Sequence, residues 1–360
     1  MKKLFGSAKG VTLLILLFMG GFVYTEAQEK GTGWVFTPLP LAFYTSDTGI
    51  AGGALLVAER GNEPSNSDPL FIQTAATYTQ KHQAELSALF QGDFSDKTYR
   101  LQGEFGFFNT PSLFYGLGPE AEVEEDYEEL KTNFELLGLR KVWKQLYGGM
   151  LYKFDYVDYT AYEKDGAIAQ YIPGAGNTVR TSNLGMVLQW DSRSSMVFPR
   201  SGSYLELRSY WANEGWGSDS DFYLVRADMR GYYSLFPQTI LAAQALGTYG
   251  HGDIPLHKMA ELGGLRVLRG YPYSRYRDKS SYVLQSELRF PIYGILRGTV
   301  FASAGQVGSS PEDFHFSVTR IAGGAGLRIR PNPGSDVQIR LDVGFSPDSF
   351  GIYITLLEAF

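Results

Sequence analysis

The segment Val337-Gln-Ile-Arg-Leu-Asp-Val-Gly-Phe345 decides the fold of this chain. Apolar residues occupy every second position, and glutamine, arginine, aspartate and glycine stand between them. Because successive side chains of a β-strand point to opposite faces of a sheet, this spacing predicts a strand with one apolar and one polar face. The segments Leu184–Trp190, Tyr99–Phe107 and Tyr223–Met229 alternate in the same way.

Alternating segments recur along the chain, and we find no helix-period segment or βα repeat between them. Their lengths suit a tilted strand that crosses a bilayer, which needs ~9–11 residues. We expect sixteen strands, at residues 35–44, 49–59, 70–80, 83–94, 97–109, 128–143, 146–159, 178–191, 202–213, 219–234, 238–250, 280–291, 296–307, 317–330, 336–346 and 350–360.

The N-terminus has the features of a secretory signal. Lys2, Lys3 and Lys9 precede an apolar run from Val11 to Tyr24, and Ala27 offers a cleavage site. The run is too short to span a bilayer, which takes ~20 residues in a helix. We therefore expect a cleaved signal peptide at 1–27 and a single barrel domain at 28–360.

Alternation alone fits either a soluble sandwich or barrel, with an apolar core, or a membrane barrel, whose apolar face meets lipid. Three features favour the membrane barrel: the strand lengths, the secretory signal, and large aromatics near segment ends, such as Tyr147, Tyr156 and Phe236. Barrels of outer membranes carry aromatic girdles at both interfaces.

The connections between the expected strands differ in length according to whether they follow an odd-numbered or an even-numbered strand. The longest ones (110–127, 160–177 and 251–279) follow odd-numbered strands, and most connections after even-numbered strands are short. This asymmetry is typical of outer-membrane barrels with both termini in the periplasm. Because lipid leaves no backbone group unpaired, the first and last strands must meet. The expected fold is all-β: a 16-stranded antiparallel transmembrane β-barrel in the cell outer membrane.

Composition excludes several kinds of site. The chain has no cysteine, so it offers no disulfide and no thiolate ligand. It carries a formal net charge of −6 and no Lys/Arg cluster, so we expect no nucleic-acid partner. We expect no cofactor and no metal ion. The acidic run at residues 120–129 predicts a solvated loop, with cations that bridge lipopolysaccharide as the alternative.

No catalytic motif is present. The chain has neither Gly-x-Ser-x-Gly nor His-Glu-x-x-His, and we expect no enzyme and no catalytic residue. The pair His251 and Asp253 leaves a hydrolase at the barrel rim as a weaker alternative, because an aspartate can orient a histidine.

Three stretches are more specific than alternation, and their order and spacing resemble the BamA/TamA superfamily of outer-membrane barrels. The resemblance extends over essentially the whole chain after residue 27 and includes a terminal aromatic residue, Phe360, as the C-terminal strand signal. The stretches are Asp191-Ser-Arg193 with Pro199-Arg-Ser-Gly202, Gly263-Gly-Leu-Arg-Val-Leu-Arg269-Gly270-Tyr271, and Ser286-Glu287-Leu-Arg289-Phe290-Pro291.

The resemblance implies that the long extracellular loop folds back into the lumen. Its arginine is Arg269, which precedes Gly270 and Tyr271, and the matching carboxylate on the barrel wall is Glu287. On the next strand the family usually has aspartate where this chain has Ser303, two residues before Gly305. We therefore expect Glu287 to carry most of the contact with Arg269, and the lock to be weaker or re-routed.

By strand parity the lumen should be lined with charges of both signs, which can pair and close it. The residues expected to face inward are Arg100, Glu104, Lys153, Asp155, Glu206, Arg208, Arg226, Asp228, Arg230, Arg328, Arg330, Arg340 and Asp342.

The resemblance implies a role in insertion or passage of proteins or lipids at the outer membrane. The expected partners are outer-membrane lipids, lipopolysaccharide, and envelope partner or client proteins. Only seven residues separate the expected cleavage site from the first strand, so we expect no periplasmic repeat domains like those of the family's best-known members. A passive diffusion pore or structural barrel is the alternative.

Two expectations concern the barrel seam. Pro38 and Pro40 lack N–H donors, so the first strand should form few hydrogen bonds with residues 350–360. Parity directs Glu358 and Phe360 to lipid. A lipid-facing carboxylate is tolerated only near the interface, so Glu358 should lie at the periplasmic rim.

Overall fold

The structure is a computed structural model that describes residues 34–60, 70–172, 176–195, 198–330, 338–356 and 358–360. The expected signal peptide at 1–27 lies outside these residues. Within them, no helix is long and apolar enough to cross a membrane.

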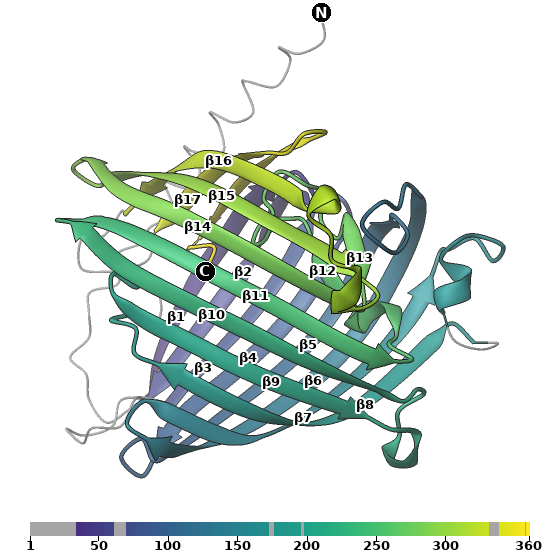
Figure 1. The fold of residues 1–360 in the computed structure, drawn as a ribbon. Helices are drawn as coiled ribbons and strands as arrows, with labels where there is room; N and C mark the ends of the chain where they lie inside the picture. The colour runs from purple at the N-terminus through teal and green to yellow at the C-terminus, as the bar shows by residue number, and fades with distance from the viewer. Residues whose placement is uncertain (1–33, 61–69, 173–175, 196–197, 331–337, 357) are drawn as a thin grey trace, which may run out of the picture.

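Sixteen antiparallel strands form one closed barrel, as predicted (Figure 1). The barrel order is β1-β18-β17-β16-β15-β14-β11-β10-β9-β8-β7-β6-β5-β4-β3-β2. The strands are β1 (Trp34–Thr45), β2 (Gly49–Arg60), β3 (Leu70–Thr79), β4 (Ala84–Phe94), β5 (Tyr99–Phe114), β6 (Glu125–Trp143), β7 (Leu146–Thr160), β8 (Thr178–Asp191), β9 (Gly202–Ala212), β10 (Phe222–Phe236), β11 (Thr239–Gly252), β14 (Ser280–Tyr293), β15 (Leu296–Gly308), β16 (Arg320–Ile329), β17 (Ile339–Phe345) and β18 (Phe350–Leu356).

The remaining elements lie in connections. The short strands β12 (Ala260–Leu262) and β13 (Tyr276–Asp278) pair within the loop between β11 and β14 and were not predicted. Single turns of 3-10 helix occur at Ala169–Tyr171, Glu214–Trp216, Leu256–Lys258, Pro311–Asp313 and Phe316–Val318.

The two ends of the barrel differ. The connections that follow β5, β7 and β11 leave from one end, which we call the long-loop end. At the other end, the short-turn end, two residues or fewer separate β6 from β7, β10 from β11, and β14 from β15. The structure therefore has the asymmetry that the sequence predicted, and the loop between β11 and β14 is long enough to reach back into the lumen.

Strand pairing fixes which side chains share the lumen. Arg100 of β5 donates to Gln189 of β8 (3.1 Å), a strand three positions away, so both side chains project into the barrel. An apolar core lies between β5–β10 and the loop after β11. It extends from Tyr147, near the short-turn end, to Phe114, Tyr159 and Leu256 near the long-loop end. This core supports the loop on one side, and the charged residues described next hold it on the other.

Candidate functional site

Arg269 lies deep in the lumen, on the loop between β11 and β14. Its side chain is 2% exposed and donates to the Glu287 carboxylate of β14 (2.5 Å) and to the Asp342 carboxylate of β17 (2.5 Å). The guanidinium also stacks on the Phe301 ring, 3.6 Å from its centroid. A buried charge is costly unless it is paired, and two carboxylates and an aromatic face supply that pairing here.

Around Arg269, arginines and carboxylates alternate in a closed ring of contacts, which we call the charge ring. Arg289 bridges Glu287 (2.8 Å) and Glu358 (3.8 Å). Arg328 bridges Glu358 (2.8 Å) and Asp342 (2.5 Å). In order, the members are Arg269, Glu287, Arg289, Glu358, Arg328 and Asp342.

The charge ring joins three parts of the chain: the loop, the barrel wall from β14 to β17, and the residues after β18. All six side chains are almost fully buried. Arg340 lies beside the ring, 3.6 Å from Asp342, so four arginines share three carboxylates. Because each carboxylate contacts two arginines of the ring, loss of any carboxylate leaves an excess of buried positive charge around the carboxylates that remain.

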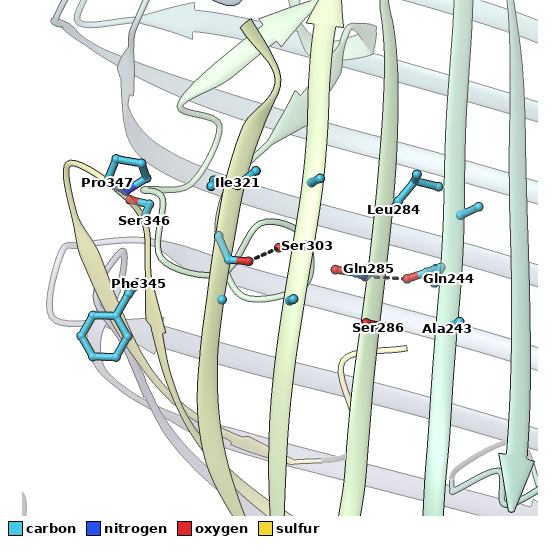
Figure 2. Close-up of a pocket in the computed structure, with 15 residues that line it drawn as sticks. Ala243, Gln244, Leu284, Gln285, Ser286, Ser303, Ile321, Phe345, Ser346 and Pro347 are labelled. Carbon is cyan, nitrogen blue, oxygen red and sulfur yellow. Dashed lines mark hydrogen bonds between the residues drawn. The ribbon is translucent and has the colours of Figure 1, made fainter. Parts of the chain in front are cut away.

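The expectation that Glu287 carries most of the Arg269 contact is wrong. Ser303 faces the lumen on β15, but its hydroxyl donates to the main-chain oxygen of Ala322 (3.4 Å; Figure 2). The second carboxylate is Asp342, two strands further around the barrel from β15. The lock is thus re-routed, and Asp342 supplies a carboxylate where Ser303 supplies none.

Gly270 allows the loop to press against the barrel wall. Its φ of +122° is in the region that favours glycine, and a Cβ there would lie 2.7 Å from the main-chain carbon of Phe345. Its N–H donates to the Tyr353 hydroxyl of β18 (3.1 Å). Tyr271 is buried and packs edge-on against Tyr276.

Gly305 makes room for a second loop side chain. Leu268, the residue before Arg269, is fully buried, and a Cβ at Gly305 would lie 3.0 Å from its Cδ1. The absence of a side chain at Gly305 therefore gives Leu268 space against β15. This pairing has no local sequence signal, since the two residues belong to segments 37 positions apart.

The loop has another attachment, on β7. The N–H of His257 donates to the Tyr159 hydroxyl (3.2 Å), and Lys258 pairs with Asp155. Burial lowers the pKa of His257 well below its usual range. Burial also lowers the pKa of Lys258, to about 7, against the attraction of Asp155. The loop thus spans the lumen between β7 and the charge ring.

The C-terminal residues do not follow the prediction. The last strand ends at Leu356 rather than at residue 360, and Glu358 belongs to the charge ring instead of the lipid-facing rim. Phe360 is buried against Tyr232 and Ala242. The alternation of side chains between lumen and lipid ends with the strand at Leu356. Beyond it, the Glu358 carboxylate pairs with arginines in the lumen, where a charge is far more stable than in lipid. Phe360 therefore does not lie on the terminal strand.

The seam between β1 and β18 is thin. The two strands are in register only at Tyr44–Ile354 and Thr45–Tyr353, and the Ser46 N–H donates to Ile352 (3.1 Å). Every other neighbouring pair of barrel strands is in register over at least seven residue pairs within the described residues. Few hydrogen bonds therefore hold the barrel closed here.

The turn motif after β8 forms a local structure at the short-turn end. Arg193 donates twice to Asp191 (2.9 and 2.7 Å), and its guanidinium lies over the Tyr204 ring. Pro199 is buried, and Gly202 begins β9. These residues lie apart from the charge ring, and their contacts shape the turn between β8 and β9.

Other candidate residues do not assemble into a site. His251 stacks on Tyr223, and no hydrogen bond joins it to Asp253 among the described residues. In the acidic segment, Glu125 accepts from the Ile168 N–H (3.1 Å), so this carboxylate holds a loop. No cluster of potential metal ligands occurs in the part of the chain that the structure describes.

The outer surface of the wall that carries the charge ring is hollowed by a groove. A groove of about 860 Å³ crosses β11, β14, β15 and β16, and Figure 2 shows its lining. Ala243, Ser286, Ala302 and Gly323 are successive cross-strand partners in it, and by parity all four face away from the lumen. Small side chains thus cover the lipid-facing side of the strands that carry the ring.

Comparison with known protein families identifies one family for this chain. The model of the Omp85 superfamily domain matches residues 70–348. No curated protein sequence shows a significant match. Among solved structures, the chain is similar to BamA from Haemophilus ducreyi lacking POTRA domains 1–3, with a TM-score of 0.63 and 12% identity, over 97% of this chain and 78% of that one.

Two further structures share the fold. CdiB from Acinetobacter baumannii matches with a TM-score of 0.58 and 13% identity, over 91% of this chain and 60% of that chain. CdiB from Escherichia coli matches with a TM-score of 0.59 and 12% identity, over 92% and 63%. The chain thus spans less than two thirds of the length of either CdiB protein.

Proposed function

Because this chain belongs to the Omp85 superfamily, we propose that it assists the insertion or passage of proteins or lipids at the outer membrane, together with partner proteins of the envelope. The long-loop end would then face the cell exterior and the short-turn end the periplasm. Outer-membrane lipids and lipopolysaccharide would surround the barrel.

The observation that carries this proposal is the thin seam. Two registered residue pairs between β1 and β18 contrast with at least seven at every other junction that the structure describes. Each backbone hydrogen bond contributes ~0.5–1.5 kcal/mol net to stability, so the cost of separating two strands rises with the number of bonds between them. The junction with the fewest bonds is therefore the least costly place to open the wall. An opening in the wall joins the lumen to the bilayer, which an insertion or passage factor needs and a passive pore does not.

The charge ring supports the same proposal from the opposite side of β18. Its ion pairs link the loop to β14 and β17 and link β16 to β17, so movement at the seam would fall on β1 and its neighbours. The rival function, a passive diffusion pore, gains some support from a cavity of about 810 Å³ that is lined by the loop, by β5 and β18, and by the turns after β1 and β3.

A disulfide across the seam tests the proposal. The chain has no native cysteine, so Tyr44→Cys with Ile354→Cys places one pair at the registered position. The matched control is Ala243→Cys with Ser286→Cys, which joins β11 to β14 at another registered, lipid-facing position. Both oxidised proteins are incorporated into phosphatidylcholine–phosphatidylglycerol vesicles, and folding of an added, urea-unfolded outer-membrane barrel protein and exchange of a fluorescent lipid are followed.

We expect the seam disulfide to abolish the stimulation and its reduction to restore it, whereas the control pair has no effect. Equal activity of the oxidised seam variant would contradict a lateral opening. An inactive wild-type protein with large, steady conductance in planar bilayers would favour the passive pore.

A further inference from the structure

The strands nearest the seam have an unusual inner face. Arg100 projects into the lumen, and its cross-strand partner on β4 is Asp93, so Asp93 faces inward as well. Since side chains alternate, Leu89, four residues before Asp93, also faces the lumen. Its partner on β3 is Gln73, and the partner of Gln73 on β2 is Val57.

The neighbouring rows continue this face toward β1. Leu55 of β2 is the partner of Leu39 of β1, and Leu41 and Phe43 follow Leu39 on the same side. We call the resulting surface the inner apolar face. Its members are Leu39, Leu41, Phe43, Leu55, Val57 and Leu89.

This surface differs from the usual polar lumen and also from the lumen-facing apolar residues of β6 and β7, such as Leu137 and Leu151, which are buried in the apolar core. Strands of outer-membrane barrels alternate apolar residues toward lipid with polar residues toward the lumen. On β2 and β4, the lipid-facing positions Leu56 and Leu86 are apolar as expected, and the lumen-facing Leu55 and Leu89 are apolar too. On β4 Leu89 is the one apolar residue among the lumen-facing positions, whereas β2 is apolar on both faces at Leu55–Val57. A stretch that is apolar on both faces normally meets an apolar environment on both sides.

The inner apolar face is only partly covered by the rest of the described chain. Leu39 is 37% exposed and Leu89 is 38% exposed, and the other four members are half-buried. Exposed apolar side chains that form a contiguous surface usually mark a binding site. The loop fills the lumen beside the charge ring, but it leaves Leu39 and Leu89 exposed and buries no member of this face completely.

The seam connects this face with the bilayer. Three members of the inner apolar face belong to β1. For the residues of β1 that precede Tyr44 in the sequence, no described residue of β18 is in register. Hydrocarbon on the outer side of the wall is therefore separated from the inner apolar face only by the edge of β1. Toward the long-loop end, Thr45 follows Phe43 on the same side of β1 and lines the cavity of about 810 Å³, together with the polar residues Lys81 and Arg266.

We propose that the inner apolar face binds the acyl chain of a membrane lipid, which enters through the seam and places its polar end in this cavity. The inference names a substrate class and rests on the proposed opening of the seam. An acyl chain fits this face better than a polypeptide does. The backbone of β2–β4 is paired within the sheet, and the edge of β1 without registered partners on β18 lies at the seam rather than on the face. The face itself therefore offers only side chains, and a peptide lying on it would keep unpaired N–H and C=O groups.

Photolabelling tests the inference with the full chain in vesicles. The vesicles contain phosphatidylcholine and phosphatidylglycerol, with a trace of phosphatidylcholine that carries a diazirine near the end of one acyl chain. After irradiation, adducts are assigned to residues by mass spectrometry. We expect adducts at Leu39 and Leu41 on the inner face in addition to Leu56 and Leu86 on the lipid-facing side.

Two matched double variants give the control. Leu55→Gln with Leu89→Gln makes the inner face polar, and Leu56→Gln with Leu86→Gln makes the same chemical change on the outer face of the same strands. The inner variant should lower adduct yield at Leu39 and Leu41 at least tenfold, equivalent to ~1.4 kcal/mol. The outer variant should leave that yield within twofold.

The following results would overturn the inference: adducts confined to Leu56 and Leu86 in the wild-type protein, an unchanged inner yield in the inner variant, or crosslinks from the inner face to added unfolded protein in place of lipid. Should the inner variant fail to fold, as seen by loss of heat-modifiable migration, wild-type labelling alone decides. Insertion activity without inner labelling contradicts only this inference, whereas inner labelling without any insertion or lipid exchange contradicts only the proposed function.

Discussion

The wall from β14 to β17 and the wall from β1 to β4 follow the same strand geometry but use opposite chemistry toward the lumen. The first carries most of the charge ring and packs against the loop, and its Arg289, Arg328 and Asp342 side chains are buried. The second carries the inner apolar face and remains accessible, with Leu39 and Leu89 exposed. The two walls meet at the seam, through β18.

This difference teaches how one barrel can be both locked and able to open. Buried ion pairs depend on their geometry, so a wall that carries the charge ring cannot move without breaking contacts worth several kcal/mol. Apolar side chains exposed to the lumen have no such partners, and their strands can shift at lower cost. The predictions below alter one wall or the other and are ordered by expected effect.

Asp342→Asn should have the largest effect. The Asp342 carboxylate contacts Arg269 and Arg328 and lies 3.6 Å from Arg340, so its loss leaves three arginines short of negative charge. We expect a cost near the upper end of the ~3–5 kcal/mol typical for breaking a buried pair. The measurement is the guanidinium midpoint of unfolding in detergent. Asp219→Asn is the control, because its ion pair with Arg180 is exposed and should contribute less than ~1 kcal/mol. Equal losses in the two variants would mean that the charge ring does not stabilise this wall.

Arg269→Ala should cost less than Asp342→Asn, near the lower end of the same range, because it also removes one positive charge from a ring with an excess of arginines. Glu287 keeps Arg289, and Asp342 keeps Arg328. The loop nevertheless loses its anchor, so we expect faster proteolysis within 253–279 and increased ion conductance in planar bilayers.

Arg269→Lys separates the effect of the positive charge from the effect of the planar guanidinium geometry. A lysine keeps the charge but cannot bridge two carboxylates with a planar fork, so it should rescue only part of the protection. Full rescue by lysine, or a loop that stays protected in Arg269→Ala, would contradict an anchoring role for the guanidinium.

The sequence predicted the barrel because lipid imposes a local rule. An alternation such as that of Val337–Phe345 needs only neighbouring residues to be recognised, and strand order then follows from short turns and closure. Arg269 and Glu287 were found because both lie in recognisable motifs. Asp342 was missed as their partner, although it was expected in the lumen, because pairing between a loop and a strand 73 residues later leaves no spacing signal.

The errors came from extending the same rule too far. Parity was carried past Leu356, where the chain leaves the sheet, and so Glu358 and Phe360 were placed toward lipid. The inner apolar face was overlooked for a related reason. A membrane barrel is expected to have a polar lumen. The apolar residues of β1 and β2 that face the lumen were therefore not distinguished from the alternating apolar residues that face lipid.

Glu358→Gln should have an intermediate effect and act at the seam. Arg328 retains Asp342 and Arg289 retains Glu287, so the loss should be about 1–3 kcal/mol, typical of one unsatisfied buried contact. Release of this side chain would free residues 358–360 from the lumen. We expect faster removal of Phe360 by carboxypeptidase than in the wild-type protein, with Glu312→Gln, an exposed carboxylate in a loop, as the control. Unchanged digestion would mean that Phe360 packing, rather than the charge ring, holds these residues.

Replacing both seam prolines, Pro38→Ala with Pro40→Ala, should have the smallest effect. Continuing the register of Tyr44–Ile354 would set Pro40 opposite Glu358 and Pro38 opposite Phe360, but both partners lie in the lumen. Restored N–H donors would therefore find no acceptor on β18, and we expect a change in unfolding free energy within ~0.5 kcal/mol.

Combining the proline replacements with Glu358→Gln separates two causes of the thin seam. If withdrawal of residues 358–360 limits pairing, the prolines should matter only when those residues are free, and a double-mutant cycle should give a coupling of ~0.5–1.5 kcal/mol, about one hydrogen bond. Amide hydrogen exchange in residues 38–43 would report the new bonds as increased protection. A large stabilisation by the proline replacements alone would show that the missing donors, and not the withdrawn C-terminus, keep β1 and β18 apart.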